Sequence, residues 1–227
     1  MSLRFSAIIT AAGSSQRFNM SSGSNLKKEF MALGSSSVLG CAIKPFLQID
    51  GLVSVIVTYR EGDLEATRKL LSDINHDIVF VRGGETRQQS VFNALKYLYE
   101  SKTEIDLVSI HDGARPFITK DLIENCLKTA EDIGGSCPCI RVTDTLVKVD
   151  ENGLMCGRIP RDGVCTVQTP QVFRFPEIYK AHLSAKADKA YTDDTEIFMD
   201  AGGKIGFVQG DSNNRKITYA SDLKEGL

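Results

Sequence analysis

Short apolar runs rich in β-branched residues alternate along the chain with longer stretches of helical pattern, and no other feature limits the possible folds as strongly. The runs at 5–10 and 52–59 are almost continuously apolar, which is typical of strands buried on both faces of a sheet. Strand patterns of this kind occur at 5–10, 52–59, 77–81 and 106–110, and helical patterns lie between them at about 37–48, 62–74 and 85–100. Strands that alternate with helices predict right-handed βαβ units and a parallel sheet.

The pattern changes in the second half of the chain. A helix over 119–133, with Thr119 as its cap, leads into a strand at 136–142. Two short strand patterns then flank Asn152-Gly153, which is a strong hairpin signal. The remaining patterns are strands at 145–149, 154–159, 164–167 and 204–208, helices near 175–186 and 193–201, and a last run at 215–219.

These patterns predict an α/β fold: a Rossmann-like, mostly parallel sheet with helices on both faces and an inserted β-hairpin arm. We expect one domain over 1–227, with the arm at about 142–162 and a long loop at 18–27. An isolated hairpin is only marginally stable in water, so we expect the arm to pack against another surface, with a second subunit as one candidate and dimerisation as the expected use.

Composition excludes several classes of protein. With 27 Lys and Arg against 29 Asp and Glu, the net charge is −2, and no basic surplus points to nucleic-acid binding. No run approaches the ~20 apolar residues that span a membrane, and the first apolar run is too short for a signal peptide. We therefore expect a cytoplasmic protein with reduced cysteines and neither a nucleic-acid nor a membrane partner.

The residues after the first strand indicate anion binding. Neither the G-x-G-x-x-G fingerprint nor the G-x-x-x-x-G-K-[ST] loop is found in the sequence, which disfavours dinucleotide oxidoreductases and P-loop NTPases. The segment 11–17 instead reads Ala-Ala-Gly-Ser-Ser-Gln-Arg. Its small residues leave backbone N–H groups free to approach a phosphate, and its Arg and the later Lys27-Lys28 add charge. A plain loop with an exposed Arg is the alternative.

Two further clusters follow predicted parallel strands. In the segment 111–116, Asp112 suits a divalent cation and Arg115 suits a phosphate, although Asp-Gly is also an ordinary turn. In the segment 82–90, Gly83 and Gly84 permit close approach of a flat ring, and Glu85 or Ser90 could hydrogen-bond the edge of that ring. The alternative for Glu85 is an acidic residue in the first turn of a helix, where it complements the helix dipole. Strand ends of one parallel sheet meet at one crevice, so the three loops together predict a nucleotide-phosphate site.

With these residues assembled, the sequence resembles the 2-C-methyl-D-erythritol 4-phosphate cytidylyltransferase family over essentially its whole length. The resemblance rests on several short motifs that are specific in this order and spacing. They are 11–13 with Arg17, Lys28-Glu29-Phe30, 83–91, 111–116, Asp144-Thr145, Arg161, Gln168-Thr169-Pro170-Gln171, Thr192-Asp193 and Lys216.

The resemblance implies transfer of CMP from CTP to a polyol phosphate, with release of pyrophosphate. It assigns catalysis to Arg17, Lys28 and Lys216, which neutralise the triphosphate and the transition state. A Mg²⁺ ion, or another divalent cation, is implied near Asp112. The residues implied for the nucleotide are Ala11, Ala12, Gly13, Gly84, Glu85 and Ser90, with Ser90 reading the edge of the cytosine.

The family builds its polyol-phosphate pocket from both subunits of a homodimer. The resemblance assigns substrate binding to Asp112, Arg115, Thr145, Arg161 and Thr192. Arg115, Thr145 and Arg161 are implied to come from the side of the neighbouring subunit, and Thr192 from the same chain. This gives the hairpin arm a purpose, because it would cross the dimer.

The chain departs from the family pattern at several positions. Lys27 and Glu29 flank Lys28 where the family has proline and glutamine, and Ser15 replaces the second glycine of the first loop. Asn213 replaces an acidic residue near the end, which leaves Asp112 as the clearest metal ligand.

Alternatives from the same and from other classes remain. A cytidylyltransferase for another polyol phosphate, such as ribitol 5-phosphate, shares the chemistry. A nucleotide-binding homologue without catalysis shares the fold, and a Rossmann oxidoreductase would need bound nicotinamide. We also expect His182 at the surface and His111 to orient its loop rather than to act as a base.

Overall fold

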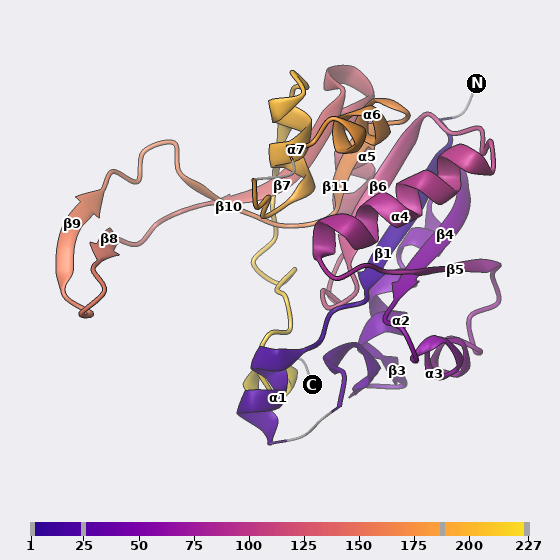
Figure 1. Cartoon of the computed structure of the whole chain (residues 1–227), viewed down its shortest axis with the longest axis horizontal. Helices are drawn as coiled ribbons and strands as arrows, with labels where there is room; N and C mark the ends of the chain where they lie inside the picture. Colours follow the sequence, from indigo (N-terminus) through magenta and orange to yellow (C-terminus); the bar gives the residue numbers. More distant parts are fainter. Residues whose placement is uncertain (1–2, 24–25, 187–188, 225–227) are drawn as a thin grey trace.

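The computed structural model describes residues 3–23, 26–186 and 189–224, and it confirms the α/β fold. Its main sheet has the strand order β10-β7-β11-β6-β1-β4-β5, with β12 paired to β7. The four strands β5, β4, β1 and β6 are parallel to one another and form the core of the sheet (Figure 1). The strands of this sheet are β1 (Phe5–Ala11), β4 (Leu52–Tyr59), β5 (Ile78–Arg82), β6 (Leu107–Asp112), β7 (Gly135–Arg141), β10 (Cys165–Val167), β11 (Gln171–Arg174) and β12 (Gly206–Gln209).

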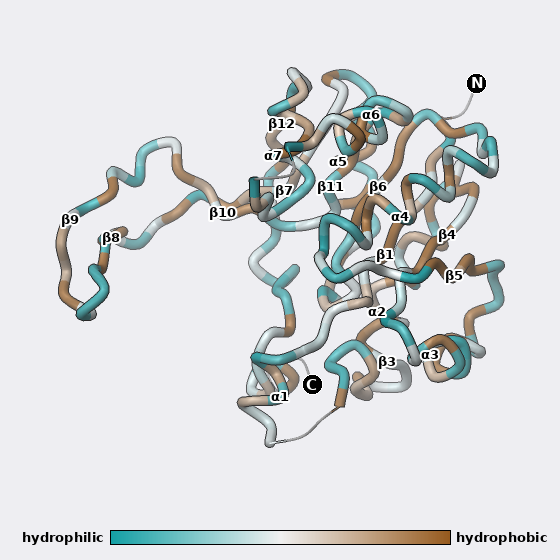
Figure 2. Tube along the Cα trace, viewed as in Figure 1, coloured by the Kyte–Doolittle hydropathy of each residue, from teal (hydrophilic) through white to brown (hydrophobic). Residues whose placement is uncertain are grey.

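Helices cover both faces of this sheet, as the sequence predicts. One face packs on α2 (Val38–Ile43) and α5 (Lys120–Ile133), and the other on α4 (Arg87–Glu100), α6 (Glu177–Leu183) and α7 (Asp194–Asp200). The remaining short elements are α1 (Gln16–Ser22), α3 (Leu64–Leu70), α8 (Ser221–Lys224), the 3₁₀ turns Lys28–Phe30 and Phe46–Gln48, and the small strands β2 (Ala32–Leu33) and β3 (Ser36–Ser37). Much of the trace along the core strands is coloured as hydrophobic (Figure 2).

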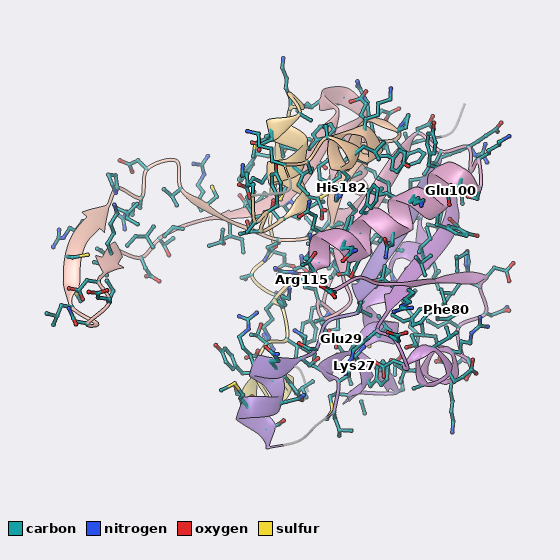
Figure 3. The ribbon with its side chains drawn as sticks, in the orientation of Figure 1. Lys27, Glu29, Phe80, Glu100, Arg115 and His182 are labelled. Carbon is teal, nitrogen blue, oxygen red and sulfur yellow. The ribbon has the colours of Figure 1, made fainter. Side chains whose placement is uncertain are left out.

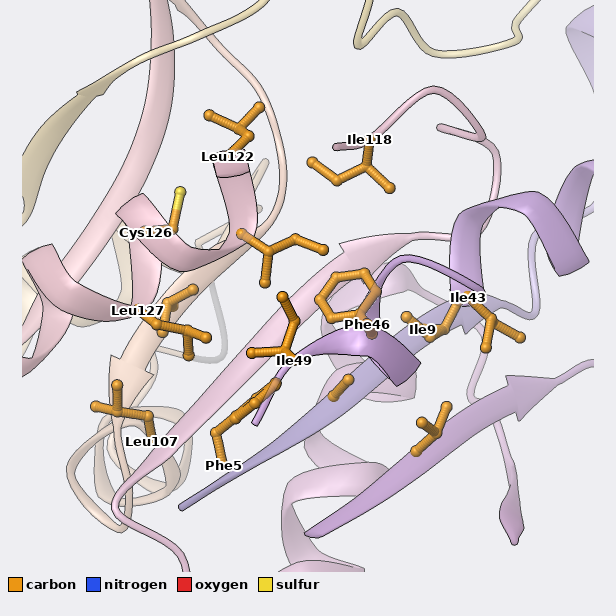
Figure 4. Close-up of a cluster of buried hydrophobic side chains, with 14 of the residues drawn as sticks. Phe5, Ile9, Ile43, Phe46, Ile49, Leu107, Ile118, Leu122, Cys126 and Leu127 are labelled. Carbon is orange, nitrogen blue, oxygen red and sulfur yellow. The ribbon is translucent and has the colours of Figure 1, made fainter. Parts of the chain in front are cut away.

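Alternation along β1 divides the core into two clusters. Phe5 and Ile9 point to the cluster that contains α2 and α5, whereas Ile8 points to the cluster beneath α4. Figure 4 shows Phe5 and Ile9 beside Phe46 and Ile49 in the first of these clusters. All three β1 side chains are fully buried, and burial of each such side chain contributes about 1.5–3 kcal/mol. The central strand is therefore apolar on both faces because both faces are covered.

Local signals set the ends of the long helices. The hydroxyl of Thr119 accepts a hydrogen bond from the N–H of Leu122, which caps α5 as predicted. Gly134 ends the same helix at φ 112°, a conformation that side chains with a Cβ rarely adopt. Thr86 caps α4 through the N–H of Gln89, so that helix begins at Arg87 rather than at Glu85.

Several sequence predictions were wrong in detail. Residues 16–22 form helix α1, not part of a long loop, because Phe18 on this helix packs with Leu33, Val38 and Ile217. The helical pattern at 37–48 is interrupted near Pro45, which cannot donate the hydrogen bond that a continuous helix requires. The run at 215–219 forms no strand.

The sheet also contains an antiparallel strand that the pattern did not predict. Strand β11 lies between β6 and β7 and is antiparallel to both. It is only four residues long and gives no periodic signal of its own. Phe173 is fully buried, against Phe198 of α7.

The hairpin arm is present and extends away from the rest of the chain (Figure 1). Its strands β8 (Leu146–Val149) and β9 (Met155–Ile159) form a separate two-stranded sheet joined at the predicted Asn-Gly turn. Every residue of β9 is exposed, including Met155 at 79%. An extended ribbon with exposed apolar side chains is unlike the surface of an ordinary loop.

His182 is not at the surface, contrary to our expectation. It is 7% exposed and its Nε2 lies 3.1 Å from a carboxylate oxygen of Asp194. The sequence gave no sign of this partner because the two residues lie on different helices. Among the described helices, none combines the length and the apolar character needed to cross a membrane.

Candidate functional site

The order of the parallel strands creates a crevice between β1 and β6. The chain passes from β1 to β4 and β5 on one side, and then returns to place β6 on the other side of β1. In sheets of this kind, ligands bind beyond the carboxyl ends of the strands at such a reversal. A pocket of about 560 Å³ lies there. It is lined by Thr10, Ala12, Gly13, Ser14, Ser15, Gln16, Arg17, Phe18, Lys28, Glu29, Arg60, Gly84, Glu85, Thr86, Arg87, Ser90, Asp112, Ala114, Lys216 and Thr218.

The loop after β1 forms one wall of the pocket. Ser15 adopts the left-handed conformation, with φ 54°, where the family pattern has glycine. Its hydroxyl donates to Glu29 and accepts a longer bond from the N–H of Lys28. The side chain thus ties the loop to the turn that carries Lys28, which provides local partners for an unfavourable backbone conformation. Arg17, on the second residue of α1, is exposed and lines the pocket.

The two adjacent lysines point to different places. The Nζ of Lys28 donates to the carbonyl of Ile217 at 2.8 Å, and its side chain lines the pocket. Burial lowers the pKa of Lys28, an effect that Glu29 opposes and Lys216 reinforces. Lys27 is not among the lining residues; its Nζ lies 2.8 Å from Asp63 and donates to the carbonyl of Ala11. Of the two adjacent lysines, Lys28 therefore lines the pocket and Lys27 does not.

Asp112 is the negative centre of the pocket. Its side chain is only 8% exposed, and one oxygen lies 2.9 Å from Lys216 and 3.3 Å from Arg115. The other oxygen lies 3.6 Å from Arg87. Burial alone would raise the pKa of the Asp112 carboxyl, but Lys216, Arg87 and Arg115 hold it well below its usual range. Three cations around one carboxylate leave a net positive charge that suits a polyanion.

His111 orients the loop, as expected. It is fully buried, with one ring nitrogen 3.1 Å from the carbonyl of Arg115 and the other 3.0 Å from the hydroxyl of Thr169. Burial lowers the pKa of His111 to about 4, so the ring is neutral near pH 7. Both nitrogens are engaged in holding the chain, which leaves no nitrogen directed at a ligand.

The loop after β5 forms the opposite wall. A Cβ at Gly83 would lie 2.4 Å from the Cβ of Ala12, so only glycine allows these two loops to approach. The hydroxyl of Ser90 accepts from the N–H of Gly84 and donates to the carbonyl of Thr86. Ser90 therefore shapes the wall in this structure. Glu85 is exposed at the rim, and Ala11 is buried behind Ala12.

The remaining predicted site residues lie outside this pocket. Thr145 and Arg161 are exposed at the base of the arm, where Arg161 donates to the carbonyl of Thr143. Thr192 is exposed two residues before α7. Arg115, which the resemblance assigns to the neighbouring subunit's site, pairs here with its own Asp112 and donates to the carbonyl of Asn214. One chain thus gathers the nucleotide residues and the cations, but not the full polyol-phosphate set.

The structure adds lining residues to which the sequence reading gave no role. Arg87, Glu29, Arg60 and Thr218 all line the pocket. Arg87 and Glu29 stand within motifs that carried the resemblance, and their position beside assigned residues was the available signal. Figure 3 labels Glu29, Lys27 and Arg115 in the region between the sheet and α1.

The position of Asp112 suits a metal ion that is bound partly by the protein and partly by a phosphate ligand. Among the described residues, no three His, Cys, Asp or Glu side chains gather as a metal site. Asp112 stands inside the pocket beside the cations, while Asn213 is exposed and outside the lining. Mg²⁺ in nucleotide enzymes is commonly held by one or two carboxylates together with substrate phosphates and water. The residues present fit such an ion.

Comparisons with known proteins agree with this geometry. The profile of the IspD family, 2-C-methyl-D-erythritol 4-phosphate cytidylyltransferase, matches residues 5–226. The cytidylyltransferase of that name from Thermotoga neapolitana is 33% identical over 96% of this chain and 93% of its own length. The bifunctional enzyme IspD/IspF of Chelativorans sp. strain BNC1 is 33% identical over 97% of this chain, which spans 53% of that relative. The solved 4-diphosphocytidyl-2C-methyl-D-erythritol synthase from Anaerococcus prevotii superposes with a TM-score of 0.82 at 28% identity, over 99% of this chain and 94% of that one.

Proposed function

Because the chain belongs to the 2-C-methyl-D-erythritol 4-phosphate cytidylyltransferase family, we propose that it transfers CMP from CTP to 2-C-methyl-D-erythritol 4-phosphate. The products are 4-diphosphocytidyl-2-C-methyl-D-erythritol and pyrophosphate, and the reaction serves isoprenoid precursor synthesis. One observation carries the proposal: Lys28 lines the same pocket as Lys216 and Asp112, which form an ion pair, beside the glycine-lined walls. That arrangement provides charge for a triphosphate and a flat slot for a base.

The transfer is a displacement at the α-phosphorus of CTP. An oxygen of the acceptor phosphate attacks, a new O–P bond forms, and the bond to the oxygen bridging the β-phosphate breaks. Pyrophosphate leaves with that oxygen and its electron pair. The acceptor phosphate is already largely ionised near neutral pH, because its second pKa is about 6, so no strong general base is needed.

Catalysis then depends on bringing two polyanions together and on stabilising the charge that develops. Arg17 and Lys28 contact the triphosphate and the transition state, and Lys216 supports them from the far end of the chain. Lys28 is already directed into the pocket by its bond to Ile217, so little reorganisation is required. The cytosine rests on Ala12 and Gly13 and on the glycine wall opposite.

Asp112 would hold a divalent cation from the protein side, and such an ion would supply positive charge against the phosphates. Lys216 and Arg115 occupy one Asp112 oxygen, and the pair keeps the carboxylate ionised and oriented toward the pocket. The metal requirement is part of the proposal.

A homodimer completes the acceptor half of the site. The arm carries Thr145 and Arg161 away from the pocket of its own chain, and apolar Leu154 and Met155 are exposed at 65% and 79%. These side chains become buried if the arm packs on a second copy of the chain. In a two-fold symmetric dimer, each arm packs on the other subunit in the same way. Thr192 joins them from the chain that holds the nucleotide.

Pyrophosphate release tests the function. The purified chain is assayed with CTP and Mg²⁺ against methylerythritol 4-phosphate and ribitol 5-phosphate, with ATP, GTP and UTP as controls. We expect release with CTP and methylerythritol 4-phosphate, and its loss when the metal is chelated. A preference for ribitol 5-phosphate would reassign the acceptor, and no release with any pair would favour a non-catalytic nucleotide-binding role.

A further inference from the structure

A line of charged and polar side chains leads from the pocket into the body of the protein. Arg87 lies between two carboxylates: its Nε is 3.6 Å from Asp112 and its Nη1 donates to Asp194 at 2.6 Å. The second oxygen of Asp194 lies 3.1 Å from the Nε2 of His182. The side chains of Asp194 and His182 are 0% and 1% exposed. Figure 3 labels His182 near α6, well away from Glu29 and Lys27.

Burying this line of charged side chains costs free energy, so the place where it lies in the protein is informative. Removing a carboxylate from water is unfavourable unless cations and donors surround it, and Asp194 meets this need with Arg87, with His182 and with its own N–H bonded to Gln171. The Nη2 of Arg87 is buried and has no hydrogen-bond partner among the described residues. A guanidinium that lines the pocket therefore has two nitrogens beside carboxylates and a third nitrogen, with two N–H donors, that meets no acceptor among the described residues.

The members of the line stand on the two halves of the proposed site. Arg87 is the first residue of α4 and directly follows the wall that carries Gly84 and Glu85. Asp194 is the first residue of α7, two positions after Thr192. The pair thus joins the start of the nucleotide-side helix to the start of the acceptor-side helix.

We infer that Arg87 is a positioning residue, held by Asp194 and His182, that fixes Asp112 and keeps the nucleotide and acceptor halves of the pocket in register. This inference rests on the proposed function. Without the charge of Asp194, Arg87 retains one carboxylate, Asp112, and turns toward it. Asp112 is then drawn away from Lys216 and Arg115, so that the acceptor phosphate is no longer held in line with the α-phosphorus of bound CTP.

The experiment compares two Asp→Asn substitutions on the same helix. Asp194→Asn removes the buried charge, whereas Asp200→Asn removes an exposed one that pairs with Lys189 at 2.8 Å. Both are assayed for pyrophosphate release well below their melting temperatures, and CTP affinity is measured separately by calorimetry. We expect Asp194→Asn to lower kcat by about tenfold to a hundredfold, with CTP affinity within about threefold of wild type, and Asp200→Asn to match wild type.

The outcomes separate the inference from the proposed function. If wild type and Asp200→Asn release no pyrophosphate, the proposed function fails. If they are active and Asp194→Asn is equally active, or loses stability while keeping kcat, Arg87 has no positioning role and the inference is overturned.

A second pair of variants covers the case in which Asp194→Asn does not fold. His182→Gln keeps a donor toward Asp194, and His182→Leu removes it. We expect the Gln variant to retain most of the wild-type kcat and the Leu variant to lose about tenfold, because only the first still holds the carboxylate in place. Equal kcat values for the two variants contradict the inference.

The double variant provides the decisive check. Arg87→Lys keeps the charge but cannot reach both carboxylates, so it should lower kcat as Asp194→Asn does. If both act through the same contact, the double variant loses no more than the worse single variant. Independent, multiplying losses would show that the two residues act separately.

Discussion

The pocket and the arm carry residues proposed for one reaction, but the chain holds them in opposite ways. In the pocket, two of the three proposed catalytic cations are held by their own chain: Lys28 bonds to Ile217 and Lys216 pairs with Asp112. In the arm, the side chain of Arg161 donates to the carbonyl of Thr143 in the same ribbon, and every residue of β9 is exposed. A folded chain can prepare the nucleotide half of the site alone, while the acceptor half depends on where the arm finally rests.

The largest expected effect is in the nucleotide half of the site, which a single chain forms, and substitution of Lys28 tests it. Lys28→Ala removes a cation already directed into the pocket, so we expect kcat to fall by about 10²–10³-fold with the fold intact. Steady-state pyrophosphate release measures the effect, and circular dichroism verifies the fold.

Lys27→Ala is the matched control. Its Nζ binds Asp63 and the carbonyl of Ala11, outside the pocket lining. We expect a loss of about fivefold at most, as for an ion pair of modest strength. Equal losses for the two lysines would mean that the assignment of Lys28 is wrong.

Substitution of Arg161 tests the acceptor half of the site, which depends on the arm. Arg161→Ala should raise KM for the polyol phosphate by about 10- to 100-fold, since a charge-assisted hydrogen bond contributes roughly 1.5–3 kcal/mol. KM for CTP should change little. A loss confined to CTP use would place Arg161 with the nucleotide and remove the distinction between pocket and arm.

Complementation decides whether the arm serves a second copy. When Arg161→Ala and Lys28→Ala chains are mixed and allowed to exchange, half of the dimers carry one of each, and about a quarter of all sites regain both residues. Activity should recover toward that level. No recovery, with mixed dimers demonstrated by native mass spectrometry, would show that each site is built within one chain.

Two glycines give a smaller and more local comparison. A Cβ at Gly83 would lie 2.4 Å from Ala12, whereas a Cβ at Gly157 in the arm meets nothing nearer than 4.0 Å, on Lys148. Gly83→Ala should raise KM for CTP by about tenfold, because overpacking commonly costs 1–3 kcal/mol. Gly157→Ala should leave that KM unchanged. A tolerated Gly83→Ala would show that the glycine wall is adaptable rather than closely packed.

The sequence predicts elements with strong local signals better than elements that depend on distant contacts. Apolar strands such as 52–59 and the cap at Thr119 are local signals, and strand order follows from a few rules of connection. The short antiparallel strand β11 and the helix α1 carry no strong period, because their stability comes from packing on distant segments. The pairing of His182 with Asp194 likewise depends on tertiary structure.

The site residues show the same difference between local signals and distant contacts. The residues at or just after the ends of parallel strands, such as Gly13, Gly84 and Asp112, meet in the pocket because parallel strands end at one edge. Thr145 and Arg161 do not, because nothing in a single chain brings the arm back to the body. Motif spacing can identify such residues, but in the proposed homodimer their site would form only on contact with the second copy.

A comparison of stability separates the two regions without any substrate, and its arm variant carries the smallest expected effect. Leu95 is fully buried beneath the sheet, and Leu95→Ala should lower the free energy of unfolding by about 2–5 kcal/mol. Met155 is 79% exposed, so Met155→Ser should change the unfolding of a dilute, monomeric sample by less than about 0.5 kcal/mol. The same substitution should weaken association in sedimentation equilibrium, because each copy would lose apolar cover at the contact. Met155→Ser that destabilises the monomer would mean that the arm folds back on its own chain, and one that leaves both quantities unchanged would place the contact between copies elsewhere.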